Sequence, residues 1–191
     1  AKNDKNLYTL GPLIHNQQAV NKLKEEGVFT AETTDDIPIG SKALVRTHGI
    51  PKDEFEKLEA RCPDVIDATC PFVKKIHKIV EKNSSEKLPL LIAGDKNDPE
   101  VVGIKSYCNG ACYIFNSCEE LEELFENNDF NQEQPFIVVS QTTFSTKEWK
   151  KCVKNINLHY TNAIIFDTIC NATEERQAEA LLLSQKNDMM I

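Results

Sequence analysis

Residues 88–107 read Leu-Pro-Leu-Leu-Ile-Ala-Gly-Asp-Lys-Asn-Asp-Pro-Glu-Val-Val-Gly-Ile-Lys-Ser-Tyr, and this stretch decides the fold class. The consecutive apolar residues at 88–93 are typical of a parallel strand that is buried on both faces. A polar turn follows at 94–98, and the segment 99–107 is predicted to be a helix. A strand followed directly by a helix is the repeating unit of an α/β protein.

Short apolar runs and longer amphipathic segments alternate in the same way along the rest of the chain. Strands are predicted at 7–10, 28–31, 43–46, 65–68, 88–93, 112–115, 135–139 and 163–166. Helices are predicted at 16–26, 51–61, 99–107, 119–126, 146–156 and 173–186, and another starts at Pro71. Proline is expected at the first helical position of the helices that open at Pro51 and Pro71. The pattern predicts an α/β fold of parallel sheets flanked by helices.

The composition excludes several classes of function. The 191 residues carry 22 Lys and Arg against 30 Asp and Glu, a net charge of −8, so neither nucleic acid nor an anionic membrane is an expected partner. No apolar run approaches the roughly 20 residues that span a bilayer, and residues 1–6 lack the apolar stretch of a secretory signal. We therefore expect a cytoplasmic protein, or one of the plastid stroma if the source is eukaryotic.

Polar and reactive side chains follow the predicted strands. In open parallel sheets ligands bind outside the carboxyl ends of the strands, so these positions are the first candidates for a site. Taken singly, His15 could be a polar residue at a helix start, His48 a turn histidine before Gly49, and Thr142 with Thr143 an ordinary strand end. The chain has only four histidines and seven cysteines, however, and two of each lie at such ends, with Cys70 and Cys170 as the cysteines. The clustering favours a functional site there.

The seven cysteines are an odd number, and none lies in a Cys-x-x-Cys pair, which favours reduced thiols over disulfides. Five are expected to be small buried apolar side chains: Cys62, Cys108, Cys112, Cys118 and Cys152. Cys70 and Cys170 are 100 positions apart, too far for a zinc finger, and two thiolates are fewer than the usual four of an iron–sulfur cluster. A zinc or thiol-redox function for Cys108, Cys112 and Cys118 is a weaker alternative.

Six motifs of the chain resemble one family, that of the 4-hydroxy-3-methylbut-2-enyl diphosphate reductases. They are Gly-Pro-Leu-Ile-His-Asn at 11–16, Arg-Thr-His-Gly at 46–49, Asp-Ala-Thr-Cys-Pro-Phe-Val at 67–73, Gly-Asp-Lys at 94–96 with Pro-Glu-Val-Val-Gly at 99–103, Ser-Gln-Thr-Thr at 140–143, and Ile-Cys-Asn-Ala-Thr at 169–173 with Arg-Gln at 176–177. They occur in the family's order and spread over most of the chain.

The resemblance implies three similar α/β lobes around a central cavity. This chain is then expected to hold a first lobe at 5–70, a second at 71–167 and the start of a third at 168–191. The implied reaction is the reductive removal of an allylic hydroxyl, which gives isopentenyl and dimethylallyl diphosphate. Electrons are expected from a ferredoxin or flavodoxin, and three cysteines of the family hold a [4Fe-4S] cluster. Cys70 and Cys170 resemble the second and third of these ligands.

The resemblance also assigns roles around the substrate. His15 and His48 are similar to the family's diphosphate-binding histidines, and a histidine near neutral pH can donate hydrogen bonds to phosphate oxygens. Glu100 resembles the acid that gives a proton to the departing hydroxyl. Thr142 resembles the hydroxyl that passes or positions that proton.

The remaining assignments concern three further residues. Gln141 and Thr143 flank Thr142 in the family motif and are expected to orient it within the substrate site. Asp98 stands where the family has a third phosphate-binding histidine, and a carboxylate there is expected to weaken the binding of a diphosphate.

Two family segments are absent from the sequence. The first cluster cysteine belongs to a Gly-Phe-Cys segment near the amino terminus, and a Ser-x-Asn segment of the third lobe binds the diphosphate. The chain is therefore expected to be a fragment that is inactive alone. The alternative from another class is a non-catalytic anion-binding or interaction domain that has lost the cluster.

Overall fold

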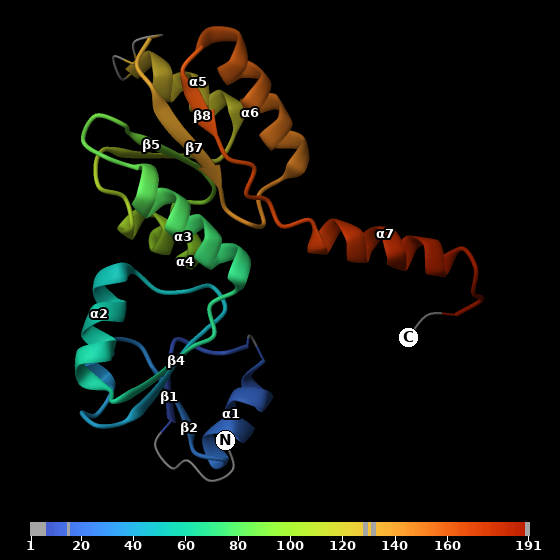
Figure 1. Cartoon of the computed structure of the whole chain (residues 1–191). Coiled ribbons are helices and arrows are strands. Elements are labelled where there is room, and N and C mark those ends of the chain that lie inside the picture. The colour runs from blue at the N-terminus through green and yellow to red at the C-terminus, as the bar shows by residue number, and fades with distance from the viewer. Residues whose placement is uncertain (1–6, 15, 128–129, 131–132, 190–191) are drawn as a thin grey trace.

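Two four-stranded parallel sheets form the frame of the computed structural model, which describes residues 7–14, 16–127, 130 and 133–189 (Figure 1). The first sheet holds β1 (Leu7–Leu10), β2 (Val28–Ala31), β3 (Lys42–Val45) and β4 (Asp64–Asp67) in the order β2-β1-β3-β4. The second holds β5 (Leu90–Ala93), β6 (Cys112–Phe115), β7 (Phe136–Ser140) and β8 (Ala163–Ile165) in the order β6-β5-β7-β8. In both sheets the first strand along the chain lies between the second and the third, and the fourth strand lies at the edge beside the third. The predicted α/β fold of parallel sheets is confirmed.

Helices connect the parallel strands. They are α1 (Gln17–Glu25), α2 (Lys52–Arg61), α3 (Pro71–Asn83), α4 (Pro99–Ser106), α5 (Cys118–Asn127), α6 (Thr146–His159) and α7 (Ala172–Ser184), with a 3-10 helix at Thr34–Asp36. In Figure 1, α7 projects away from the second sheet. None of the helices in the described ranges is both long and apolar enough to cross a membrane.

Three local features differ from the sequence prediction. The strand predicted at 88–93 begins only at Leu90, although the Pro89 carbonyl already accepts a hydrogen bond from Ile137 of β7. Pro51 caps α2 in an extended conformation with ψ of 149° rather than occupying its first turn, whereas Pro71 does open α3 as predicted. The 3-10 helix was not predicted, because a single turn has no hydrophobic period.

Burial on both faces explains the unbroken apolar run of β5. Leu91 and Ala93 pack on the side of α5 and α6, while Leu90 and Ile92 pack with α3 and α4 on the other. All four side chains are fully buried. Each leucine or isoleucine buried in this way contributes roughly 1.5–3 kcal/mol relative to an exposed one.

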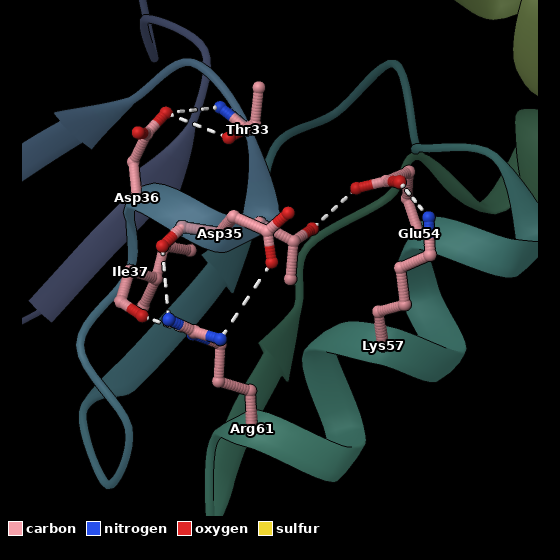
Figure 2. Close-up of polar contacts among 8 residues, drawn as sticks. Thr33, Asp35, Asp36, Ile37, Glu54, Lys57 and Arg61 are labelled. Atoms are coloured by element: carbon pink, nitrogen blue, oxygen red, sulfur yellow. Dashed lines mark hydrogen bonds and ion pairs between the residues drawn. The ribbon is translucent and has the colours of Figure 1, made fainter.

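A polar network fastens α2 to the 3-10 helix (Figure 2). The Arg61 guanidinium donates hydrogen bonds to the carbonyls of Ile37 and Asp35, the latter at 3.0 Å. Glu54 of α2 accepts from the Thr34 hydroxyl at 2.5 Å. These contacts join residues 20 or more positions apart in the chain. They stabilise the 3-10 helix, which is only three residues long.

The helices of the two sheets meet where α2 contacts α3 and α4. The Lys52 backbone N–H donates to the Ser106 hydroxyl at 2.9 Å, and the Lys52 ammonium pairs with Glu81 at 2.6 Å. In the same region the His77 ring stacks on Tyr107 with centroids 4.3 Å apart. The Lys52 contacts therefore join a helix of the first sheet to the helices of the second.

Candidate functional site

The loop after β5 leads into α4 through a capped turn. Asp98 is the N-cap of α4, and its Oδ1 accepts a hydrogen bond from the Glu100 backbone N–H at 2.8 Å. Pro99 lies at the first helical position, where its missing N–H costs nothing. The cap and the proline fix Glu100 in the first turn of α4, where the residue is only 3% exposed.

The Glu100 carboxylate meets Thr142 at the end of β7. The Thr142 backbone N–H donates to Glu100 Oε1 at 2.6 Å, and the Thr142 hydroxyl donates to Oε2 at 2.8 Å. Burial raises the pKa of Glu100 above its ordinary value, and the two Thr142 hydrogen bonds only partly oppose this rise. A carboxyl with a raised pKa that bonds a buried hydroxyl has the properties of a general acid.

Gln141 ties the loops after β5 and β7 together. Its Oε1 accepts the Asp95 backbone N–H at 2.8 Å, and its Nε2 donates to Thr143 Oγ1 at 2.7 Å and to Asp98 Oδ2 at 3.3 Å. Gly94 allows this close approach, since a Cβ there would lie 2.6 Å from Gln141 Oε1. Gln141 thus holds the turn that carries Glu100 against the strand end that carries Thr142.

Asp98 contacts protein groups with both carboxylate oxygens, one on the α4 N-terminus and the other on Gln141. The negative charge of Asp98 also raises the pKa of Glu100, though less than burial does. Asp98 therefore has a local structural role as a helix cap and as a partner of Gln141. Its predicted effect on diphosphate binding stays a prediction.

His48 lies in the turn after β3 of the first sheet, and this turn ends with Gly49 at φ of 75°. The side chain is half-buried, and its Nδ1 is buried with no hydrogen-bond partner among the described residues. A positive charge on the His48 ring would lower the pKa of Glu100, so the two side chains lie within electrostatic range of each other. His15, the other predicted histidine, lies outside the described residues.

Arg46 was not predicted as a site residue, although it opens the motif that holds His48. Its guanidinium packs against Gly11, where a Cβ would lie 2.8 Å from Nη1, and Gly11 itself has φ of 72°. Arg46 Nε is buried and has no hydrogen-bond partner in the described part of the chain. The sequence prediction ended this strand at Arg46, whereas β3 ends at Val45, so only the structure places Arg46 directly after a strand, where ligand-binding groups occur.

Cys70 and Cys170 occupy equivalent places in the two sheets. Cys70 N–H donates to the Thr47 carbonyl, and Cys170 N–H donates to the Thr142 carbonyl, both at 2.8 Å. Both side chains are half-buried and free. Two accessible thiols at strand ends fit the thiolate chemistry of an iron–sulfur site. No group of three or more His, Cys, Asp and Glu side chains able to hold a metal is found among the described residues.

The other cysteines are less uniform than expected. Cys62 and Cys152 are buried, as predicted. Cys108, Cys112 and Cys118 are only half-buried, because they lie at the edges of the apolar clusters around the second sheet.

Comparison with known proteins gives consistent matches. A family model described as LytB protein matches residues 1–191. A 4-hydroxy-3-methylbut-2-enyl diphosphate reductase of Caldanaerobacter subterraneus is 41% identical over 193 residues, which cover 98% of this chain and 64% of the relative. The reductase of Clostridioides difficile is 35% identical over 190 residues, covering 100% of this chain and 67% of the relative. This chain therefore spans about two thirds of the length of these relatives.

Two solved structures share the architecture. One, described as the (E)-4-hydroxy-3-methyl-but-2-enyl diphosphate reductase that is the terminal enzyme of the non-mevalonate pathway, matches with a TM-score of 0.81 and 36% identity. The match covers 98% of this chain and 65% of that one. The E-1-hydroxy-2-methyl-but-2-enyl-4-diphosphate reductase of Plasmodium falciparum also matches with a TM-score of 0.81, at 25% identity over 95% of this chain and 57% of that one.

Proposed function

Because the chain belongs to the LytB protein family, we propose that it forms part of a reductase acting on 4-hydroxy-3-methylbut-2-enyl diphosphate. The reaction removes the allylic hydroxyl with two electrons and two protons, giving water and either isopentenyl or dimethylallyl diphosphate. The observation that carries the proposal is the buried pair of Glu100 and Thr142. The reaction needs a proton donor at the departing oxygen, and this pair supplies one.

Glu100 acts as the acid in this proposal. A departing hydroxyl is a poor leaving group, and a proton from the carboxyl converts it to water. The raised pKa keeps a larger share of Glu100 protonated near neutral pH than an exposed carboxyl would have. The Thr142 hydroxyl holds the carboxyl in one orientation and can pass the proton onward, while Gln141 and Thr143 keep the threonine in place.

The substrate's diphosphate is assigned to groups at the strand ends of the first lobe. His15 and His48 are the proposed hydrogen-bond donors, and Arg46 adds a permanent positive charge beside Gly11. Arg46 Nε is buried without a partner among the residues that the structure describes, which supports this role, because a buried polar group without a partner costs free energy unless a ligand satisfies it. The negative charge of Asp98 is proposed to oppose this binding.

Cys70 and Cys170 are the proposed protein ligands of a [4Fe-4S] cluster. When bound, such a cluster supplies electrons and a Lewis-acidic iron. The chain's own contribution is to hold both thiols at the edge of the site, through their backbone hydrogen bonds to Thr47 and Thr142. A ferredoxin or flavodoxin is the proposed electron donor.

The proposed lobes are residues 5–70, 71–167 and 168–191. The division is supported by the two separate sheets, since no strand of residues 7–67 pairs with a strand of residues 90–165 among the described ranges. The boundary at Cys70 and Pro71 coincides with the start of α3.

The test uses the complete gene product, purified and assayed under anaerobic conditions with the substrate and a chemical reductant. We expect formation of both five-carbon diphosphates. We also expect the iron and sulfide content per chain to equal that of one [4Fe-4S] cluster. Iron-loaded protein that leaves the substrate unchanged would overturn the proposed function.

A second candidate function is supported by Asp98 alone. A non-catalytic anion-binding or interaction domain would tolerate a carboxylate at the position of a phosphate-binding histidine. It would bind the diphosphate or a protein partner without consuming substrate, and it would retain neither iron nor sulfide after reconstitution. The same anaerobic experiment therefore distinguishes the two functions.

A further inference from the structure

A groove of about 650 Å³ runs along α3, the helix that follows the proposed cluster ligand Cys70. Thr69 and Pro71, the two chain neighbours of Cys70, line the groove at the start of the helix. Lys82 and Asn83 line it at the last turn. In Figure 1, α3 begins at the segment that joins the two sheets. The groove therefore follows the whole helix and begins beside the proposed iron–sulfur site.

Four lysines of α3 line this groove. They are Lys74, Lys75, Lys78 and Lys82. Lys74, Lys78 and Lys82 are four positions apart, which places them in one row along the helix. Like charges at this spacing repel one another and destabilise a helix. Helix stability therefore gives no reason for the row, whereas attraction of an acidic partner does.

Most of the positive charge in the groove is not neutralised by the described part of the chain. Glu81, the one acidic residue of α3, pairs with Lys52, and Asp67 pairs with Lys74, both at 2.6 Å. The other three lysines of the groove are exposed and form no ion pair with the residues that the structure describes. This positive surface is local, since the whole chain has a net charge of −8.

Part of the groove lining is apolar. Ile79 of α3 and Phe166, which follows β8, both line it and are half-buried. Apolar contact surface surrounded by charged groups is the usual arrangement of a protein interface. A small anion would contact the lysines but leave the apolar lining exposed to water. The groove therefore fits a protein that carries both carboxylates and apolar side chains.

We propose that this groove, with Lys75, Lys78 and Lys82, is the docking surface of an acidic electron-transfer protein that passes electrons to the site at Cys70 and Cys170. The proposal rests on the proposed function, whose reaction consumes two electrons per substrate. Carboxylates of the donor pair with the lysines, which brings the donor's redox centre to the end of the groove beside Cys70. Charge pairs of this kind mainly raise the rate of encounter, which suits a donor that leaves after each electron.

A second copy of this chain is the competing occupant of the groove. Helix α5 carries five glutamates and no lysine or arginine, so its charge also complements the lysine groove. Such an arrangement would make the protein self-associate in the absence of any donor. Size-exclusion chromatography at low salt should show the same oligomeric state for the native protein and for Lys75→Glu with Lys78→Glu. A native oligomer that these replacements dissociate would overturn the assignment to a donor.

The experiment measures turnover of the complete gene product under anaerobic conditions with two reductants. One is a reduced acidic bacterial ferredoxin, and the other is reduced methyl viologen, a small cation that needs no lysine docking surface. The variant is Lys75→Glu with Lys78→Glu, which leaves the pair of Lys74 and Asp67 in place. We expect the KM for ferredoxin to rise ~10-fold or more, while viologen-driven turnover stays within about twofold of the native value.

Two matched variants separate the position of the charges from their number. Lys22→Glu with Lys24→Glu makes the same change in net charge at exposed positions of α1 and should leave the KM for ferredoxin unchanged. Lys75→Arg with Lys78→Arg keeps the charge in the groove and should keep the native KM.

Salt provides an independent readout of the same contact. Raising the ionic strength from about 0.01 M to about 0.15 M shortens the Debye length from about 30 Å to about 8 Å. The native KM for ferredoxin should rise over this range, whereas that of Lys75→Glu with Lys78→Glu should change little. Viologen-driven turnover should not show this salt dependence.

The two reductants also distinguish failure of this inference from failure of the proposed function. Native protein that is inactive with viologen would overturn both. Native protein that is active with viologen, but whose KM for ferredoxin is unchanged in Lys75→Glu with Lys78→Glu, would overturn the docking surface alone. An equal effect of the α1 control, or loss of viologen-driven turnover in the groove variant, would also overturn it, because the lysines would then act through overall charge or on the catalytic site.

Discussion

Glu100 and Thr142 lie 42 positions apart in the chain, yet both oxygens of the Glu100 carboxylate accept hydrogen bonds from Thr142, one from its backbone and one from its hydroxyl. The backbone bond fixes the carboxylate regardless of the side chain at position 142. The hydroxyl bond adds a group that can exchange a proton with the acid. This division of roles makes the two interactions separable by mutation.

Replacing Glu100 with Gln should abolish proton donation while preserving the contact. The introduced amide can accept from the Thr142 N–H and donate to its hydroxyl oxygen, which mimics the protonated acid. In the complete gene product, turnover should fall by ~100-fold or more, the usual range for a lost general acid. Glu119→Gln, at an exposed carboxyl in the first turn of α5, is the control and should retain full turnover. Near-normal turnover of the Glu100 variant would contradict its role.

Replacing Thr142 with Val should shift the titration of Glu100 upward. The variant keeps the backbone N–H but loses the hydroxyl donor, which lowers the pKa of Glu100 in the native protein. Thr142→Ser retains a hydroxyl and should titrate close to the native protein. The measurement is a carbon NMR titration of the Glu100 carboxyl in this chain, with Glu100→Gln to assign the signal. An unchanged midpoint in the Val variant would show that the hydroxyl bond does not act on the acid.

Asp98 should contribute to stability through the α4 N-cap and oppose diphosphate binding through its charge. Asp98→Ala should lower the free energy of unfolding by about 1 kcal/mol, the usual cost of a lost cap, as measured by urea denaturation. Asp98→Asn keeps a capping oxygen and should unfold like the native chain.

The same Asn variant isolates the charge. If Asp98 repels the diphosphate, calorimetric titration of the complete gene product should show tighter substrate binding for Asp98→Asn. Asp98→His restores the family residue but sacrifices the cap, so its stability should resemble that of the Ala variant. Equal substrate affinities for Asp and Asn would show that the carboxylate does not act on the ligand.

His77 should make the chain less stable in acid. Burial lowers the pKa of His77 from 6.5 to about 4, while Asp67 and Glu81 act in the opposite direction. The unfolded chain takes up a proton below pH 6.5 that the folded chain accepts only near pH 4, so stability is lost as the pH falls through this window. The size of the shift corresponds to roughly 2 to 3 kcal/mol between neutral pH and about pH 4.5.

The check on His77 is urea unfolding of His77→Phe at both pH values. Phenylalanine keeps a ring against Tyr107 but has no proton to bind, so the variant should lose less stability on acidification than the native chain. Equal acid sensitivity of the two proteins would exclude His77 as the cause.

The sequence predicted those elements whose determinants are local. The unbroken apolar run of β5 follows from burial on both faces, and the periodic apolar residues of α3 follow from burial on one. Asn16 at the predicted start of a helix is the N-cap of α1, and its side chain accepts from two backbone N–H groups. The six motifs likewise lie in short segments that can be read without knowing how the chain folds.

Tertiary structure decided the relationships between those segments. The order of strands in the two sheets depends on which apolar faces bury one another, and no local pattern specifies it. The 3-10 helix at Thr34–Asp36 depends on Arg61 and Glu54, which come from a different element. A local sequence pattern does not indicate which distant residues will supply the hydrogen-bond partners of a segment.

The candidate site divides in the same way. The sequence by itself placed Glu100, Thr142, Cys70 and Cys170 after predicted strands, because parallel strands present their carboxyl ends to ligands. Only the folded chain decided that Asp98 turns toward the α4 N-terminus and that the pKa of Glu100 rises on burial. Orientation and desolvation arise from contacts between distant segments, and these exist only once the sheets and helices have packed.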